Sequence, residues 1–205
     1  MPTLAIIQEK PIANSLAACL EIALASIERA VSEGAQIIVF GECWFTGYPA
    51  WIDHCLDLGL WEHEPVKEVW ARLYANGLEI PGPEVEQLCA LAARHEVVLV
   101  LGANEVIRRG KGNGSLYNTA LIIDSKGRIA NHHRKLMPTY TERMIHGLGD
   151  GQGLQSVPTQ YGDIGALICW EHWMPLARQA MHDAGEQIHV ALWPCVKENN
   201  ILASR

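Results

Sequence analysis

Three side chains that could take part in covalent catalysis stand just after short apolar segments of the sequence. They are Glu42, Lys135 and Cys169, and the segments before them cover residues 37–40, 129–133 and 164–168. Apolar runs of this length predict buried strands. In layered α/β proteins the ends of strands share a common edge, where residues distant in sequence can meet. We therefore expect the three side chains to form one cluster.

The chemistry that such a cluster supports is nucleophilic attack by a cysteine. A free thiol has a pKa of ~8.5, so only a small fraction is thiolate at neutral pH, and a working site needs a base or a cation nearby. Glu42 can act as the base. Lys135 can hold the thiolate and then the anionic tetrahedral species that forms after attack. The helix that Pro175 opens would add the positive end of its dipole to the same region.

Each of the three residues also has an ordinary structural explanation. A buried cysteine is usually a small core residue, a glutamate after a strand is usually solvated, and Lys135 follows a run of basic residues that would suit an exposed turn. The flanking sequences favour the chemical interpretation. They read FGECW, RKLMP and ICWEH, so each polar group stands among apolar and aromatic residues that would exclude water.

At these positions the chain resembles the nitrilase family, within the superfamily of carbon-nitrogen hydrolases. The resemblance is carried by FGECWFTGYP at residues 40–49, HRKLMPTYTER at 133–143 and ALICWEHWMP at 166–175, and GLGDG at 147–151 extends it. The order glutamate, lysine, cysteine is the family's order. The similarity runs along nearly the whole chain, from Leu4 to the last residues.

The resemblance implies a role for each residue of the cluster. Cys169 is expected to be the nucleophile, Glu42 the general base and Lys135 the group that stabilises the oxyanion or thioimidate. Glu142 matches the family's second glutamate and would set the protonation of Lys135 and the approach of water. Independently of the resemblance, Trp44, Tyr48, Trp170 and Trp193 are candidates for the walls of the substrate pocket where they stand next to the catalytic positions, although aromatic residues are more often part of the core. No metal or organic cofactor is implied.

The resemblance further implies an α/β fold of the carbon-nitrogen hydrolase type, a four-layer α-β-β-α sandwich. Members of the family pair through helices, so a homo-oligomer is expected. We expect residues 1–205 to form one carbon-nitrogen hydrolase domain. Family members are usually longer, and this chain ends at Arg205, where further strands and helices would follow. The sandwich is therefore expected to be incomplete at the C-terminus, in a shortened member or a fragment.

The apolar pattern predicts elements that fit this architecture. A helix begins after a cap at Asn14 and stops at Gly34, between strands at Leu4–Ile7 and Ile37–Phe40. Residues 51–76 are expected to hold short helices. The other predicted elements are a helix from Pro83 to about His95, a strand at 97–101 that ends at Gly102, antiparallel strands at 116–123 and 129–133, a strand at 164–168, a helix at 175–184 and a last strand at 188–193.

Composition narrows the classes of function. A formal net charge of -7 and a pI near 5.7 argue against nucleic acid as a partner. No secretion signal is recognisable, and no apolar run approaches the ~20 residues that span a bilayer, so we expect a cytoplasmic protein without a membrane partner. The six cysteines contain no C-x-x-C pair and are expected to be reduced.

The histidines offer two further hypotheses, which the sequence does not favour. His132 and His133 lack the i, i+4 spacing of a helical zinc motif. His172 follows Cys169 closely, but adjacency along the chain rarely gives the orientation of a Cys-His dyad. We therefore expect His172 to have a structural or pocket-lining role.

Taken together, the residues and the resemblance predict a nitrilase-type hydrolase that converts a nitrile to the carboxylic acid and ammonia through a covalent intermediate on Cys169. Trp170 and the pair Trp44-Phe45 favour this branch of the superfamily. An amidase or carbamoylase would use the same cluster, and cyanide-hydrolysing enzymes share the branch. The alternative from another class is a shortened remnant that serves in assembly or binding. The presence of all four polar site residues argues against it.

Overall fold

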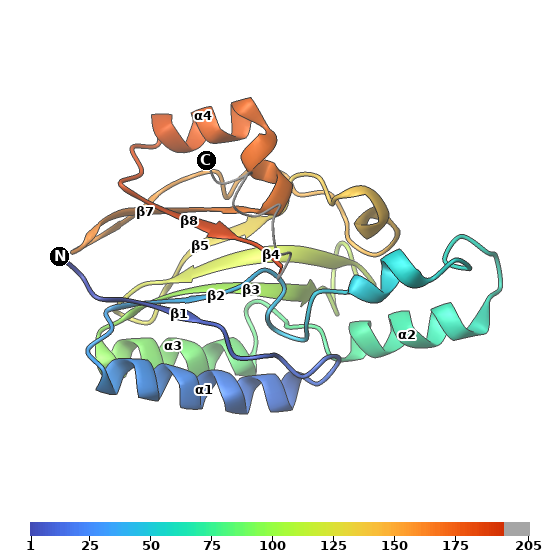
Figure 1. The fold of residues 1–205 in the computed structure, drawn as a ribbon, viewed down its shortest axis with the longest axis horizontal. Helices are drawn as coiled ribbons and strands as arrows, with labels where there is room; N and C mark the ends of the chain where they lie inside the picture. Colours follow the sequence, from blue (N-terminus) through green and yellow to red (C-terminus); the bar gives the residue numbers. More distant parts are fainter. Residues whose placement is uncertain (195–205) are drawn as a thin grey trace.

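The strands expected from the apolar segments assemble into two β-sheets that pack face to face (Figure 1). The structure is a computed structural model and describes residues 1–194. The larger sheet has the order β1-β2-β3-β4-β5. Its strands are β1 (Leu4–Ile7), β2 (Ile37–Phe40), β3 (Val98–Val106), β4 (Leu116–Ile123) and β5 (Ile129–Arg134). The first three strands pair in parallel, and β4 and β5 continue the sheet as antiparallel hairpins.

The smaller sheet has the order β6-β7-β8. It consists of β6 (Val157–Thr159), β7 (Gly162–Ile168) and β8 (Ile188–Leu192). Strands β7 and β8 are parallel, and the crossover between them passes through a short 3-10 helix, η3 (Cys169–Trp173), and α4 (Pro175–Asp183). Helix α4 covers the outer side of this sheet (Figure 1).

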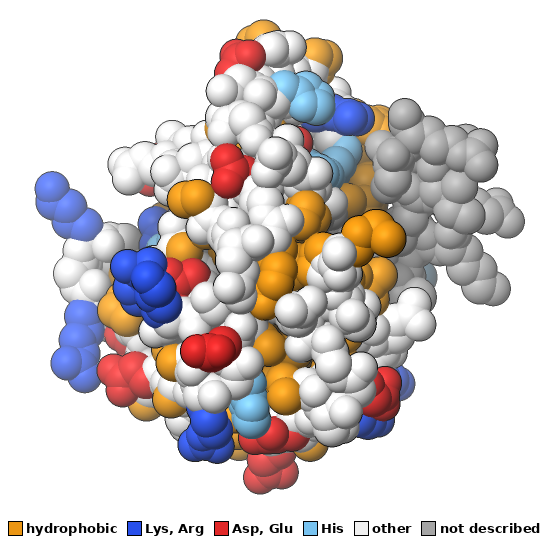
Figure 2. All heavy atoms as spheres, turned by 90° about the vertical axis from the view of Figure 1, so that its left-hand side faces the viewer, with side chains coloured by type: hydrophobic (Ala, Val, Ile, Leu, Met, Phe, Trp, Pro, Cys, Tyr) orange, Lys and Arg blue, Asp and Glu red, His pale blue; other side chains and the backbone are white. Residues whose placement is uncertain are grey.

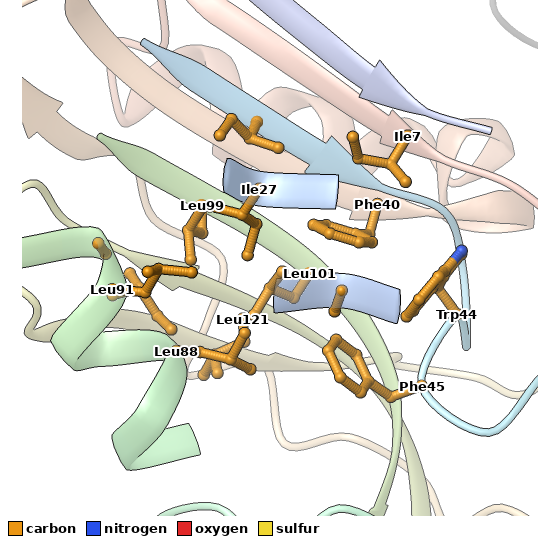
Figure 3. Close-up of a cluster of buried hydrophobic side chains, with 14 of the residues drawn as sticks. Ile7, Ile27, Phe40, Trp44, Phe45, Leu88, Leu91, Leu99, Leu101 and Leu121 are labelled. Carbon is orange, nitrogen blue, oxygen red and sulfur yellow. The ribbon is translucent and has the colours of Figure 1, made fainter. Parts of the chain in front are cut away.

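Two helices cover the outer face of the larger sheet: α1 (Leu16–Ser32) and α3 (Pro83–His95). The apolar face predicted for the first helix packs here. Ile27 of α1 and Leu88 of α3 meet Leu99 and Leu101 of β3 in one buried cluster (Figure 3). Leu20 of α1 belongs to the same cluster. Burial of such side chains is worth about 1.5–3 kcal/mol each before the cost of ordering them.

A second apolar cluster fills the space between the two sheets. On the larger sheet the inward side chains include those of Val39, Val100 and Ile122, and on the smaller sheet they include those of Ile164 and Val190. The layers therefore follow the order helix, sheet, sheet, helix, and the predicted α-β-β-α sandwich is confirmed. Residues 195–205, including Cys195 and the predicted incomplete end of the sandwich, lie outside the described residues.

The segment between β2 and α3 forms an excursion to one side of the sandwich, with η1 (Ala50–His54) and α2 (Glu64–Ala75). A third apolar cluster joins this excursion to the sheet and to a further short helix, η2 (Tyr140–Met144). It contains Ile52, Leu73, Val106, Leu116 and Ile145. The short helices expected at residues 51–76 are thus present, although α2 is a regular α-helix of 12 residues.

Two local predictions from the sequence were wrong, and one strand was missed. The first helix is capped by Ser15, because Asn14 adopts a left-handed φ of 54° and its N–H binds the carbonyl of Thr46. Strand β6 was missed, since three residues give too short a pattern to detect. Strand β3 does not end at Gly102 but continues to Val106. A glycine interrupts a strand pattern without ending the strand where another backbone approaches closely.

The charged side chains on the surface are of mixed sign. On the face drawn in Figure 2, Lys and Arg side chains are interspersed with Asp and Glu and do not form one basic patch. Among residues 1–194, no helix is long and apolar enough to cross a membrane. The same residues contain no group of three or more His, Cys, Asp or Glu side chains that could hold a metal ion.

Gly102 shows how closely the strands approach at the edge that carries the reactive residues. A Cβ at this position would lie 2.1 Å from the carbonyl oxygen of Gly41 and 2.9 Å from the Cα of Glu42. We expect Gly102→Ala to lower the free energy of unfolding by about 1–3 kcal/mol or more, because backbone has to move. Gly59→Ala is the control, since nothing lies within 4 Å of its Cβ position. Equal urea midpoints for the two variants would contradict the close approach of the backbone at Gly102 to that at Gly41 and Glu42.

Candidate active site

A buried lysine ammonium forms the centre of the site. Lys135, directly after β5, donates to Glu42 Oε1 at 3.0 Å and to Glu142 Oε2 at 2.8 Å. Glu42 follows β2, and Glu142 belongs to η2. All three side chains are no more than 1% exposed. The structure thus brings together the three charged residues that the sequence predicted.

Asn118 of β4 also belongs to this cluster, and the sequence analysis missed it. Its Nδ2 donates to Glu42 Oε1 at 2.7 Å and to Glu142 Oε1 at 3.2 Å. Its carbonyl oxygen accepts the backbone N–H of Lys135. A polar residue within an apolar strand could have been noticed in the sequence. The sequence alone does not show that this residue shares a face of the sheet with Lys135.

Local structure fixes the carboxylate of Glu142 from the other side. Glu142 forms a capping box with Thr139 at the start of η2, and the backbone N–H of Thr139 donates to Glu142 Oε2. The helix is held in place by Ile145, which packs in the third apolar cluster, and by a bond from the Thr141 hydroxyl to Asp53 at 2.7 Å. Glu142 therefore presents its carboxylate to Lys135 in one orientation.

Cys169 stands at the point where β7 turns into η3. Its backbone φ is 53°, in the left-handed region, and its side chain is 4% exposed. A residue other than glycine in this region costs of order 1–3 kcal/mol, and such strain gathers at functional sites. The sulfur lies within electrostatic range of the backbone N–H of Trp170 and of the side chains of Glu42, Lys135 and Glu142. Cys169 thus completes the predicted group of four.

The electrostatics of the site shift the pKa values of the two glutamates in opposite directions. Burial raises the pKa of Glu42 to about 7, and the charge of Glu142 adds to this while Lys135 opposes it. Burial acts the same way on Glu142, but the charge and hydrogen bond of Lys135 and the N–H of Thr139 outweigh it and lower the pKa of Glu142. Burial opposes the charge on Lys135, yet the two carboxylates raise its pKa above the usual value. Near neutral pH, Lys135 and Glu142 are therefore charged, and Glu42 exchanges its proton.

Cys169 is held as a thiol in this arrangement. Burial raises the pKa of its thiol, and the charge of Glu42 raises it further, against the effects of Lys135 and the Trp170 N–H. The thiol must therefore lose its proton to a base at the moment of attack. Glu42 offers a suitable atom: among the described residues no donor reaches its buried Oε2, because Lys135 and Asn118 both bind Oε1.

Three of the four aromatic residues predicted to line the pocket are near the site in the chain or in space, and their contact with a substrate stays a prediction. Tyr48 is half-buried. Burial raises the pKa of its hydroxyl, and the nearby charges of Glu142 and Glu42 raise it further. Trp170 is 37% exposed and packs edge-on against Trp173. The carbonyl oxygen of Trp193 accepts the backbone N–H of Glu42 at 3.3 Å.

Trp44 is not brought to the cluster, which corrects its prediction as a pocket residue. Its indole ring packs against Phe40 and Phe45 in the core between the larger sheet and its helices (Figure 3). The ring N–H donates to the carbonyl of Glu9 at 2.9 Å. The side chain is therefore buried in the core on the helix side of the sheet and does not reach the cluster.

His172 contacts the backbone of Cys169 and not its sulfur. Its Nδ1 lies 2.6 Å from the Cys169 carbonyl oxygen, and its Nε2 lies 2.9 Å from Nε2 of His189. The ring also stacks on Trp193. This geometry agrees with the structural role expected for His172, which supports the strained turn at the cysteine.

These residues together form a site for attack on an electrophilic carbon. A thiol, a base with a pKa near neutral and a fixed ammonium stand in one water-excluded cluster, and the ammonium can stabilise negative charge that develops on an atom bonded to that carbon. The arrangement needs no metal to generate the nucleophile.

Comparison with known proteins identifies similar sequences and folds. The sequence pattern of the family described as carbon-nitrogen hydrolase matches residues 3–202. Nitrilase 2 of Arabidopsis thaliana is 39% identical over 186 residues, which are 91% of this chain and 53% of the relative. The arylacetonitrilase of Macrophomina phaseolina is 36% identical over 197 residues, 93% of this chain and 54% of the relative. The chain thus spans about half the length of the curated relatives it matches.

Solved structures with the same fold are more distant in sequence. Nit3 of Saccharomyces cerevisiae, a member of the nitrilase superfamily, superposes with a TM-score of 0.73 at 21% identity, over 98% of this chain and 67% of the other. An amidase of Nesterenkonia sp. superposes with a TM-score of 0.67 at 17% identity, over 98% of this chain and 68% of the other. At these identities the likeness concerns the fold alone.

The buried charges of the cluster should depend on one another for stability. Lys135→Met leaves two buried carboxylates without their cation, so we expect the free energy of unfolding at pH 8 to fall by about 3–5 kcal/mol. The loss should be smaller at pH 5, where the carboxyl groups can take up protons. Arg29→Met is the control, because its ion pair with Glu9 is exposed and worth about 1 kcal/mol or less. A loss at pH 8 no larger than that of the control would show that the cluster is not held by Lys135.

Proposed function

We propose that this chain, which belongs to the carbon-nitrogen hydrolase family, hydrolyses nitriles to carboxylic acids and ammonia with Cys169 as nucleophile. The observation that carries the proposal is the buried Lys135 ammonium between Glu42 and Glu142, with the thiol of Cys169 in electrostatic range of all three. Named nitrilases among the curated relatives at 36–39% identity support the nitrile as substrate.

The first half of the reaction forms a covalent thioimidate. Glu42 accepts the proton of Cys169 at Oε2 while the sulfur adds to the nitrile carbon, and the nitrile nitrogen takes up the electron pair of the broken π bond. Lys135 stabilises the negative charge on that nitrogen, and a proton from Glu42 then neutralises it. Glu142 keeps Lys135 charged and aimed at the nitrogen, because it shares the ammonium through a 2.8 Å bond.

The second half releases both products. Glu42 removes a proton from a water molecule as its oxygen adds to the thioimidate carbon, and passes this proton to the nitrogen. The hydroxyl proton of the resulting tetrahedral species then moves to the nitrogen as well, and ammonia leaves to give a thioester. A second water, activated by the same carboxylate, adds to the thioester carbon. Collapse of that species breaks the carbon–sulfur bond, releases the carboxylic acid and restores the thiol of Cys169. Two waters are consumed for each nitrile.

The apolar surroundings of the site favour a nitrile over an amide. Tyr48 lies in electrostatic range of Cys169, Trp170 follows the cysteine in the chain, and Trp193 follows the neighbouring strand β8. This supports an apolar pocket that a linear and weakly polar nitrile can enter at little desolvation cost. An amide brings donors and an acceptor that must find partners or lose about 1–3 kcal/mol each. Hydrolysis of amides or carbamoyl compounds remains the second candidate, since the same four polar residues would serve it.

Assembly and location follow as further parts of the proposal. We infer that copies of the chain associate, which the exposed apolar side chains of Trp173 and Leu176 beside the smaller sheet support. Work in the reducing cytoplasm is supported by the five described cysteines, all of which carry free thiols. Residues 1–194 share continuous apolar cores, which supports a single domain.

The substrate class can be tested with a nitrile and an amide that carry the same side chain, by following ammonia release. We expect faster release from the nitrile, and loss of release by a factor of about 10³ or more from Cys169→Ala. Cys89→Ala is the control, since Cys89 lies in α3 on the far side of the larger sheet. Faster release from the amide would transfer the chain to the amidase branch. Activity that survives without Cys169 would reject the nucleophile.

The pH dependence distinguishes which glutamate is the base. Glu42 can accept the thiol proton only when it is ionised, and its pKa is raised to about 7. For a nitrile that does not titrate, kcat/KM should therefore fall about tenfold per pH unit below about pH 7. The pKa of Glu142 is lowered, so an acid limb below pH 4.5 would assign the base to Glu142 instead. Glu42→Gln should abolish the activity, and no change of pH should restore it.

A further inference from the structure

Glu171 is a fully buried carboxylate that takes no part in the steps above. It stands two residues after Cys169, in η3, and its side chain is 0% exposed. Its Oε1 accepts the backbone N–H of Leu136 at 2.7 Å, and its Oε2 accepts the backbone N–H of Ile168 at 2.7 Å. Nε2 of His133 lies 2.9 and 3.0 Å from the two oxygens. A single side chain thus satisfies donors from two parts of the chain.

The two backbone donors adjoin two reactive residues. Leu136 comes directly after Lys135, at the exit of β5, and Ile168 comes directly before Cys169, at the end of β7. These strands belong to different sheets. Between the sheets the contacts are otherwise mostly apolar, and apolar contacts resist separation far better than they fix a lateral position. Hydrogen bonds have directions and set that position.

The chemistry depends on this position. Lys135 must reach an atom that is bonded to the carbon attacked by Cys169, so an error of about 1 Å between the two residues can cost about 10² in rate. Lys135 is tied to the larger sheet through Asn118, whereas Cys169 is tied to the smaller sheet through its own strand. Among the described residues, Glu171 is the side chain that hydrogen-bonds to the backbone next to both.

We propose that Glu171 is a positioning residue that sets the location of Lys135 relative to Cys169 by bridging the exits of β5 and β7. The proposal rests on the proposed function only for its effect on turnover. The bridge requires a side chain that accepts at both oxygens, because the backbone N–H of Leu136 donates to one oxygen and that of Ile168 donates to the other. An amide would present its own NH₂ group to one of them and leave that donor unpaired, while an aspartate is one methylene too short to reach both loops.

The test compares three variants at equal amounts of folded protein. Glu171→Gln and Glu171→Asp are the variants of interest, and Asp keeps the charge in case Gln prevents folding. Glu105→Gln is the matched control. Glu105 is equally buried and binds Arg134 and His132 of β5, but on the helix side of the larger sheet, away from β7. Each variant is examined for unfolding, for kcat and KM with a nitrile, and for the rate at which iodoacetamide alkylates Cys169.

We expect kcat of both Glu171 variants to fall by about 10–10² with less than a threefold change in KM. Alkylation of Cys169 should slow by about tenfold, because Lys135 no longer helps to stabilise the thiolate. Alkylation of Cys89 in the same sample is the internal reference. The Glu105 variant should lose stability while it keeps kcat and the alkylation rate of the unchanged protein.

Two results would overturn the proposal: unchanged kcat and alkylation in a folded Glu171→Asp, or equal losses of both quantities in the Glu105 and Glu171 variants. The alkylation rate also separates this proposal from the proposed function. If the unchanged protein releases no ammonia from any nitrile but the Glu171 variants still slow the alkylation of Cys169, the positioning role holds and the function fails. If alkylation is unaffected as well, both fail.

Discussion

The burial of the Lys135 ammonium is the constraint on which the rest of the structure depends. Removing such an ion from water costs several kcal/mol even after the protein relaxes, so its partners must stand ready when the sandwich closes. Two carboxylates and one ammonium leave one excess negative charge. Asn118 and the backbone N–H of Thr139 share that excess through hydrogen bonds. The strand ends, the capping box of η2 and the register of β4 with β5 together place the groups that balance the charge of Lys135.

The excess charge falls unequally on the two carboxylates, and this inequality gives the site its chemistry. Glu142 holds the shorter bond to Lys135 and an additional backbone donor, so it remains ionised. Glu42 is left with burial and a neighbouring negative charge, so it binds a proton near neutral pH. Residues of one type, a few ångströms apart, thus become a permanent anion and an exchangeable base. The lysine between them is the reason that both can be buried at all.

Sequence reasoning identified the residues whose type and position after a strand are enough to reveal them. Glu42, Lys135 and Cys169 follow strands that periodicity locates well, and Glu142 came from the resemblance to a family. Asn118 and Glu171 were missed because their roles depend on strand register and on contact between sheets, which no local pattern encodes.

Trp44 was assigned to the pocket because it lies close to Glu42 in the sequence. Alternation along a strand predicts which way a side chain points only while the backbone stays extended. Cys43 has a φ of 47°, which turns the chain between Glu42 and Trp44 and sends the indole into the helix-side core.

The bond between the Glu42 N–H and the Trp193 carbonyl has a consequence for how the protein folds during its synthesis. On a ribosome, the first sheet can form early, yet the backbone of the base meets its partner only after more than a hundred further residues have emerged. The backbone of the base is therefore fixed late in synthesis, when the second sheet can already cover the thiol.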